Sequence, residues 1–419
     1  MRSVSFGIAA GLAFAVGAAA AEAPRDFVFG TGSAQAGAIT VPVGTRYSPG
    51  AGYGFEPGAP VRADARGCAS DRPFWFSVAE PEGNYRVDVE LGDSDGASDT
   101  TVRAELRRLV VEPTAARPGE LVRRSFLVNI RTPDFGAGGT VRLKPRERTG
   151  EIWDWDAKLT LEFDGPHPAV SRITVTPVTV PTVYLAGDST LCDQPYEPYC
   201  SWGQILPDFL GLRAAVANHA ESGESLRSFA DEHRIEKLDT LMKPGDYLFV
   251  QFGHNDQKLR GPGVGASTTF RAALEHLVSD ARAHGTHPAL ITAVSRRTFG
   301  ADGKIQNSLG DFPEVTRQVA AEMKVPLIDL NALSTTLYEA LGPEGAKALF
   351  PTVNGKLEGT HHNDYGAYEI AKCVVEGMRR CDLPIAPAVP AFNPAQPDPV
   401  SAYAIPSSPL ATHEIPYGN

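Results

Sequence analysis

The chain has 419 residues, 42% of them hydrophobic and 21% charged, which is the balance of a globular protein with room for more than one core. Its formal net charge is −11, from 50 acidic and 39 basic residues, and it contains no long basic run. Because phosphate binding needs clustered Lys and Arg, we expect no nucleic-acid partner.

The N-terminus predicts an export signal. Arg2 precedes an apolar run, rich in Ala and Gly, that extends over residues 6–21 and ends among small residues suited to A-x-A cleavage. A membrane anchor is the alternative, but the run is short for a span and lacks a stop-transfer cluster. We therefore expect a signal peptide at residues 1–23, a secreted or periplasmic protein, and no membrane contact beyond export.

Residues 24–177 predict a β-sandwich. Apolar residues recur at every second position in runs such as 85–91, 125–130 and 158–163, which places them on one face of a strand. Gly, Pro and Asp separate these runs, as is typical of many short strands joined by turns. Trp75 is interpreted as a residue of the sandwich core, and a platform for sugar stacking is the alternative.

Short apolar runs alternate with helix-like stretches across residues 178–384. The predicted strands are 183–186, 246–252, 289–294 and 325–330, and the predicted helices are 268–284, 313–323 and 365–378. This alternation predicts a parallel sheet covered by helices on both faces, with reactive residues beyond the C-terminal ends of its strands. Residues 385–419, rich in Pro and Ala, predict an extended tail that lies on the surface or is partly disordered.

The sequence contains five cysteines, and export makes disulfides possible. Cys192 with Cys200 and Cys373 with Cys381 are the natural local pairs, which leaves Cys68 over. Five free thiols are the alternative, because spacing alone cannot fix connectivity. None of the cysteines has zinc-site spacing.

Two polar turns that follow predicted strands carry candidate catalytic groups. Ser189, in Gly-Asp-Ser, follows the strand at 183–186 and can attack a carbonyl once a base takes its proton. Asn255, in Gly-His-Asn-Asp, follows the strand at 246–252, and its side-chain amide can stabilise an oxyanion. Each sequence is also an ordinary turn, so neither is decisive alone.

Two further turns complete the set. His361 can serve as the base, and Glu358, three residues earlier, can reach its other ring nitrogen and orient it. Asp364 is an alternative partner for that imidazole. His361 and His362 are also possible metal ligands, but adjacent side chains diverge and no other ligand has the right spacing, so no metal is expected. Gly223 lies in a fourth polar turn, where its backbone N–H can approach a bound oxygen.

In their order and neighbours these turns resemble the SGNH hydrolase superfamily, also called the GDSL family, and within it the rhamnogalacturonan acetylesterase-like carbohydrate esterases. The motifs are V-Y-L-A-G-D-S-T at 183–190, N-H-A-E-S-G-E-S at 218–225, F-G-H-N-D at 252–256 and T-H-H-N-D-Y-G-A at 360–367. The match covers residues 181–382. It implies a flavodoxin-like, three-layer α/β hydrolase domain with a parallel sheet over residues 178–384. The preceding β-sandwich resembles galactose-binding-like modules.

The resemblance also implies roles for individual residues. Ser189 is the expected nucleophile, His361 the base and Glu358 the orienting acid, although the family most often has Asp at that third position. The backbone N–H groups of Ser189 and Gly223, with the amide of Asn255, are expected to form the oxyanion hole. Chemistry of this kind needs no metal and no organic cofactor.

The predicted function is removal of O-acetyl groups from an acetylated polysaccharide or oligosaccharide, with pectic rhamnogalacturonan as the foremost substrate. Trp202, Arg296 and His362 are candidate substrate-binding residues, and a core Trp and a solvated Arg are the structural alternatives. The alternative functions are an esterase for other acetylated glycans such as xylan or for short acyl esters, and a carbohydrate-binding protein with an inactive esterase fold. Deletion of the sandwich is expected to leave activity on a small ester.

Overall fold

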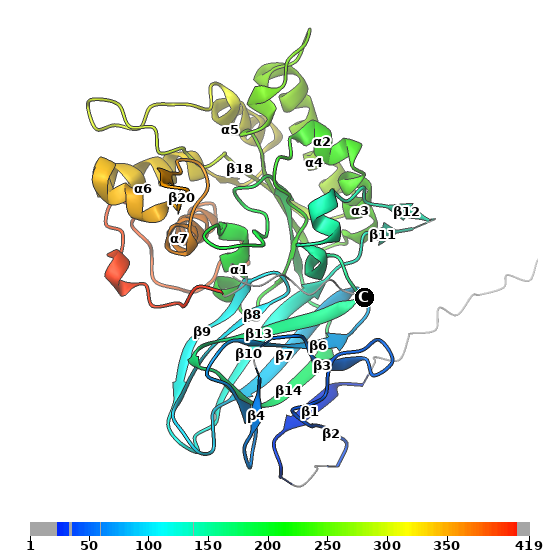
Figure 1. Ribbon diagram of the computed structural model, residues 1–419. Helices are drawn as coiled ribbons and strands as arrows, with labels where there is room; N and C mark the ends of the chain where they lie inside the picture. Colours follow the sequence, from blue (N-terminus) through cyan, green and yellow to red (C-terminus); the bar gives the residue numbers. More distant parts are fainter. Residues whose placement is uncertain (1–22, 33–35, 59, 137, 409–419) are drawn as a thin grey trace, which may run out of the picture.

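The computed structural model describes residues 23–32, 36–58, 60–136 and 138–408 (Figure 1). The predicted signal peptide lies outside these residues, apart from its last position. Figure 1 shows two halves, an all-β half below and a half with helices around a sheet above. Within the described ranges, no helix combines the length and the apolar character needed to cross a membrane.

Two large sheets make up most of the N-terminal half, which also contains the two-stranded pair of β11 (Asp134–Phe135) and β12 (Gly139–Thr140). The first contains β1 (Arg25–Phe29), β2 (Ile39–Val41), β4 (Arg62–Ala63), β5 (Cys68–Ala69), β7 (Gly83–Leu91), β10 (Val122–Ile130) and β14 (Ala169–Pro177). The second contains β3 (Tyr53–Phe55), β6 (Phe74–Ala79), β8 (Ser98–Ala104), β9 (Arg108–Ala116) and β13 (Lys158–His167). The strand pairs are antiparallel except for β1 with β2. The three predicted runs correspond to β7, β10 and β13.

The two sheets share one hydrophobic core. In β7 every second side chain from Tyr85 to Leu91 is buried, as the alternating sequence predicts. Phe76 of β6 meets Phe29 of the facing sheet edge to face, with ring centroids 5.1 Å apart. The two sheets therefore pack face to face, and the likeness to galactose-binding modules stays a prediction.

Trp75 points away from this core. It lies in a small separate cluster with Leu106 and Trp153, and its side chain is only 3% exposed. Its indole Nε1 donates a hydrogen bond to Glu162 Oε2 (3.3 Å). Trp75 is thus buried, although not in the main core, and its ring offers no platform for a sugar.

A five-stranded parallel sheet forms the centre of the C-terminal half. Its strands are β15 (Thr182–Gly187), β16 (Ala215–Asn218), β17 (Tyr247–Gln251), β18 (His287–Ile291) and β19 (Leu327–Ile328). Their order, β16-β15-β17-β18-β19, places the first strand between the second and third, which is the flavodoxin-like arrangement. The predicted parallel sheet is confirmed.

Helices cover both faces of this sheet (Figure 1). They are α1 (Trp202–Leu210), α2 (Leu226–Asp231), α3 (Arg234–Leu241), α4 (Arg271–Ala283), α5 (Phe312–Met323), α6 (Leu330–Gly345) and α7 (Asp364–Arg380). Helices α1, α6 and α7 share a core with Val183 and Leu185, whereas α2 to α5 share a second core with Tyr184 and Ala186. Alternate side chains of one buried strand thus serve opposite layers, which confirms the three-layer α/β fold.

A short connection joins the two halves. Only residues 178–181 separate the end of β14 from the start of β15. Asn84 of β7 forms hydrogen bonds at both ends of this connection. Its carbonyl accepts from Val178 N (2.9 Å), and its side-chain amide donates to Thr182 Oγ1 (2.8 Å). The connection is therefore bonded to the first half at Val178 and at Thr182, the residue that directly follows it.

Two buried arginines of the first half also reach into the second. Arg108 Nε donates to Asp193 Oδ2 (2.7 Å). Arg107 Nη1 donates to the carbonyls of Gln194 and Tyr199 (3.0 and 2.8 Å). The loop that follows Ser189 in the chain is thus held in place by the N-terminal half.

The described part of the predicted tail runs back along the molecule to the first half. It contains a single short 3-10 turn at Val400–Ala402. Ser408 is buried, where its hydroxyl donates to Glu162 Oε2 (3.0 Å) and its backbone N–H donates to Glu197 Oε1 (3.1 Å). The described part of the tail is extended, and Ser408 anchors it between the two halves.

Candidate active site

Ser189 stands in the turn that follows β15. Every residue of this strand is buried, and the strand ends at Gly187, where a Cβ would lie only 1.9 Å from Leu191 Cδ2. The side chain of Asp188 shapes the turn, because its Oδ1 accepts from the N–H and the hydroxyl of Thr190 (3.0 and 2.8 Å). The local sequence therefore fixes where the Ser189 hydroxyl lies.

A buried imidazole supports the same turn. His254 Nδ1 lies 3.5 Å from Asp188 Oδ2. Burial raises the pKa of Asp188, but His254 and the bonds from Thr190 lower it by more, so the pKa ends below its ordinary value. Asp188 is therefore an ionised group at neutral pH that holds the turn.

His361 meets Ser189 across 172 positions of sequence. It lies between α7 and a small hairpin formed by β20 (Thr352–Val353) and β21 (Lys356–Leu357). Its Nε2 is 2.9 Å from Ser189 Oγ, which is hydrogen-bond distance. Burial lowers the pKa of His361 below 6.5, although Glu358 acts in the opposite direction. A neutral imidazole is thus available to accept a proton from the serine.

Glu358 lies near the other ring nitrogen without bonding to it. Its Oε2 is 3.7 Å from His361 Nδ1, beyond hydrogen-bond range, and the same oxygen accepts from Gly359 N–H (3.2 Å). The alternative acid, Asp364, lies instead against Arg107 Nη2 (3.4 Å). Of the two carboxylates that the sequence offered, Glu358 is the one that faces the imidazole.

Two backbone N–H groups of the predicted oxyanion hole donate to no acceptor among the described residues. These are the N–H groups of Ser189 and Gly223. Gly223 has a φ of +84°, which favours glycine, and its loop is attached to the strand end by a hydrogen bond from Glu221 N to Gly187 O (3.2 Å). Both groups can therefore bind an oxygen atom of a ligand.

The Asn255 side chain is oriented from both ends. Its Nδ2 donates to Glu224 O (2.9 Å), and its Oδ1 accepts from Lys258 Nζ (2.7 Å). Because an amide nitrogen carries two hydrogens, one remains for a further acceptor. The lysine contact fixes which end of the amide is the donor.

Two predicted substrate-binding residues are buried instead. Trp202 is 0% exposed at the start of α1, and its indole Nε1 donates to Gln251 Oε1 (3.0 Å). His362 is 1% exposed with Nε2 2.7 Å from the Tyr338 hydroxyl, and burial lowers its pKa to about 3. Neither side chain can reach a polymer, so both predictions were wrong.

Arg296, the third candidate, is half-buried beside the loop that carries His361. Its Nε donates to Thr360 Oγ1 (3.2 Å), and its Nη1 donates to Ser308 O (3.2 Å). Burial lowers the pKa of Arg296, while the carboxylate of Asp188 raises it. The guanidinium is therefore close enough to the catalytic turn to be influenced by its charge, and its substrate role stays a prediction.

All five cysteines are free thiols. Cys192 Sγ contacts Ser222 Oγ (3.3 Å), whereas Cys200 Sγ faces Ser201 O (3.8 Å). Because the two sulfurs of the first predicted pair are directed to different partners, the free-thiol alternative describes this structure.

Sequence reasoning missed several groups around the site. Tyr199 places its ring edge against His361, with centroids 5.9 Å apart and planes at 89°. Lys258 orients Asn255. Its position three residues later in the chain could have indicated this contact, because residues three apart in a helical turn lie side by side. Lys144 and Arg146 reach the loop of Gly223 from the other half of the molecule, which no sequence pattern indicated.

The chain belongs to the GDSL-like lipase/acylhydrolase family, whose profile matches residues 185–366, and it is a carboxylic ester hydrolase. Over 214 residues it is 41% identical to rhamnogalacturonan acetylesterase RhgT from Bacillus subtilis (strain 168), a match that covers 48% of this chain and 91% of that protein. It is also 29% identical over 377 residues to the uncharacterized esterase YxiM of the same strain, covering 85% of this chain and 90% of that protein.

The crystal structure of protein YxiM from Bacillus subtilis is similar as well. It has a TM-score of 0.49 and 25% sequence identity, and the match covers 86% of this chain and 99% of that chain.

Proposed function

We propose that this protein is a serine esterase that removes O-acetyl groups from a polysaccharide through an acetyl-serine intermediate. The observation that carries the proposal is the 2.9 Å contact between Ser189 Oγ and His361 Nε2 at the C-terminal end of β15. The imidazole has a lowered pKa and is therefore neutral near pH 7. A hydroxyl beside a neutral base is the arrangement that nucleophilic ester cleavage requires.

In the first step, Ser189 Oγ forms a bond to the acetyl carbonyl carbon while His361 Nε2 takes the hydroxyl proton. The carbonyl oxygen gains the negative charge and is held by the N–H groups of Ser189 and Gly223 and by the Asn255 amide. The carbon–oxygen bond to the sugar then breaks, and His361 returns its proton to the departing sugar hydroxyl.

In the second step, water replaces the sugar. His361 takes a proton from the water, whose oxygen attacks the acetyl-Ser189 carbonyl, and the same donors hold the second oxyanion. Collapse releases acetate and restores the serine hydroxyl. Glu358 supplies negative charge near Nδ1 throughout, which favours the imidazolium that forms in both steps.

For the substrate, we propose acetylated pectic rhamnogalacturonan. Support comes from the relative named rhamnogalacturonan acetylesterase, which is aligned over 91% of its own length. Arg296, half-buried beside the catalytic turn, is the proposed contact to the sugar. Acetylated xylan and short acyl esters are the alternatives that the experiment below separates.

We further propose that residues 1–23 direct export, so that the enzyme works outside the cytoplasm, where plant polymers are met. The proposed domains are a β-sandwich at 24–177 that resembles galactose-binding modules, the hydrolase domain at 178–384 and the tail at 385–419. A sugar-binding role for the first domain would have to use a surface other than Trp75, which is buried.

The test is acetate release from a panel of acetylated rhamnogalacturonan, acetylated xylan and p-nitrophenyl acetate, with wild type and Ser189→Ala. We expect the highest kcat/KM on rhamnogalacturonan and no turnover by the variant on any substrate. Full activity of Ser189→Ala would overturn the mechanism, whereas a preference for xylan would overturn only the assigned polymer.

A further inference from the structure

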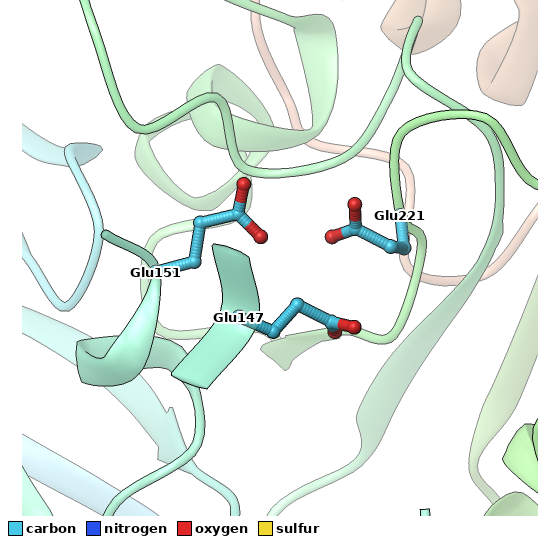
Figure 2. A group of neighbouring side chains, drawn as sticks. All are labelled: Glu147, Glu151 and Glu221. Carbon is cyan, nitrogen blue, oxygen red and sulfur yellow. The ribbon is translucent and has the colours of Figure 1, made fainter. Parts of the chain in front are cut away.

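A segment of the N-terminal half lies against the loop that carries Gly223. It comprises residues 144–154, including the 3-10 turns Pro145–Arg148 and Ile152–Asp154, and it lies outside the family-matched range of 185–366. In Figure 2 the teal ribbon of this segment presents Glu147 and Glu151 towards Glu221, which stands on the green loop. Two halves of the chain therefore meet at the proposed oxyanion hole.

Two cations from this segment bind one carbonyl oxygen of the loop. Lys144 Nζ donates to Ser222 O (2.9 Å), and the guanidinium of Arg146 donates to the same oxygen. Each cation is also paired with a carboxylate of the loop: Lys144 with Glu224, and Arg146 with Glu221 through Nε (2.6 Å). The carbonyl of Ser222 is thus fixed by two charged donors.

The Ser222 carbonyl and the Gly223 N–H belong to the same peptide group. A trans peptide is planar, so its C=O and N–H bonds point in opposite directions, and fixing one fixes the other. A donor on the carbonyl oxygen also draws electron density from the nitrogen, and this cooperative effect makes the N–H a stronger donor. Two positive charges on Ser222 O therefore both aim and strengthen the Gly223 N–H.

The neighbouring carboxylates are the anchors of this arrangement. Glu147, Glu151 and Glu221 have oxygen atoms within 4.8 Å of one another, a spacing that is also found in metal sites. Here two of the carboxylates are paired with arginines. Glu147 Oε2 accepts a hydrogen bond from Arg234 Nη2 (2.6 Å), and Glu221 accepts one from Arg146. Burial, followed by the nearby Glu221 carboxylate, raises the pKa of Glu151 to about 10, so a proton completes the balance. We infer no metal site from this cluster.

We propose that Lys144 and Arg146 are positioning residues for ester hydrolysis, which hold and polarise the Ser222–Gly223 peptide so that Gly223 N–H binds the oxyanion. This inference rests on the proposed role of Gly223. It assigns the N-terminal half a part in the chemistry itself. It also replaces the expectation that a chain without that half would keep its activity on a small ester.

The test uses the full chain with Lys144→Met, Arg146→Met and the double substitution, assayed with p-nitrophenyl acetate. Loss of a single oxyanion donor lowers kcat by about 10²–10³-fold, so we expect about a 10-fold loss in each single variant and about 100-fold in the double variant. KM should stay within twofold, because a neutral ground-state carbonyl needs the donor far less. Lys144→Arg and Arg146→Lys should recover most of the rate.

Inhibition by a phenylboronic acid is the second measurement, because this compound forms a tetrahedral adduct with an active serine. A purely structural effect of the substitutions would not change this inhibition. The inhibition constant should rise in parallel with the loss of kcat. Arg148→Met is the matched control, because Arg148 lies on the same 3-10 turn with its side chain exposed, and its rate should not change. Circular dichroism verifies folding, and the single variants carry the test if the double variant does not fold.

The proposal is overturned if the double variant keeps kcat within twofold while Ser189→Ala is inactive, or if Arg148→Met loses as much activity as Lys144→Met. Activity in Ser189→Ala would instead overturn the proposed function itself.

Discussion

The contribution of Glu358 can be measured by Glu358→Gln, which removes the charge and keeps the shape of the side chain. With 3.7 Å between Glu358 Oε2 and His361 Nδ1 and an effective dielectric of about 40–80 for this partly exposed pair, the attraction to an imidazolium is about 1–2 kcal/mol. Loss of this attraction should lower kcat/KM by about 5- to 30-fold, because the imidazolium forms in the transition state.

The pH dependence of the same variant gives an independent check. Activity requires neutral His361, so kcat/KM should rise with pH and level off above the pKa of His361, which lies below 6.5. Glu358 raises that pKa, so its neutralisation should move the acidic limb to lower pH. The measurement is kcat/KM for p-nitrophenyl acetate between pH 4 and 8. A displacement of the profile by one pH unit corresponds to about 1.4 kcal/mol.

Glu344→Gln serves as the control, because that residue is an exposed Glu paired with Lys347 (2.6 Å), and its profile should match wild type. An unmoved acidic limb together with kcat/KM within twofold of wild type would refute the role given to Glu358.

Three further substitutions separate catalysis from stability. Asn255→Ala removes an oxyanion donor and should lower kcat by about 10²–10³-fold with little change in KM, as steady-state kinetics will show. Trp202→Phe leaves Gln251 Oε1 without its buried donor, and should lower the free energy of unfolding by about 1–3 kcal/mol in urea with KM unchanged. Arg108→Met removes the nearer of two cations from the buried Asp193 carboxylate and leaves Arg131 at 3.9 Å. It should cost about 3–5 kcal/mol in the same measurement, and a loss below about 1 kcal/mol would contradict the importance of this ion pair.

The parts of the fold that the sequence predicted well are those where one periodicity dominates. The alternating burial of β7 and the three-layer fold built around β15 follow directly from such patterns. The meeting of Ser189 with His361 was predictable because motifs at the ends of parallel strands converge on one edge of the sheet.

The errors arose where tertiary packing decides the outcome. Trp202 was placed near substrate because it follows a loop, yet Ser201 and Gln204 form a capping box that marks a buried helix start. The burial of His362 depends on Tyr338, whose approach no local pattern records. β16 was missed because the sequence Ala-Val-Ala-Asn is too short to show a period.

The contacts made by Lys144 and Arg146 could not be predicted from sequence at all. They join segments that are 78 and 75 positions apart in the chain, and each is a single charged side chain in an irregular stretch. Only the packing of the two halves brings them together.

The bonded connection at residues 178–181 has a mechanical consequence. Asn84 binds both of its ends, so it cannot act as a tether with reach of its own. Any polymer captured by the first half would stand at one set offset from Ser189. Successive deacetylation along one glycan chain would then require the glycan to slide or rebind, because the bonded connection gives the two halves no free reach.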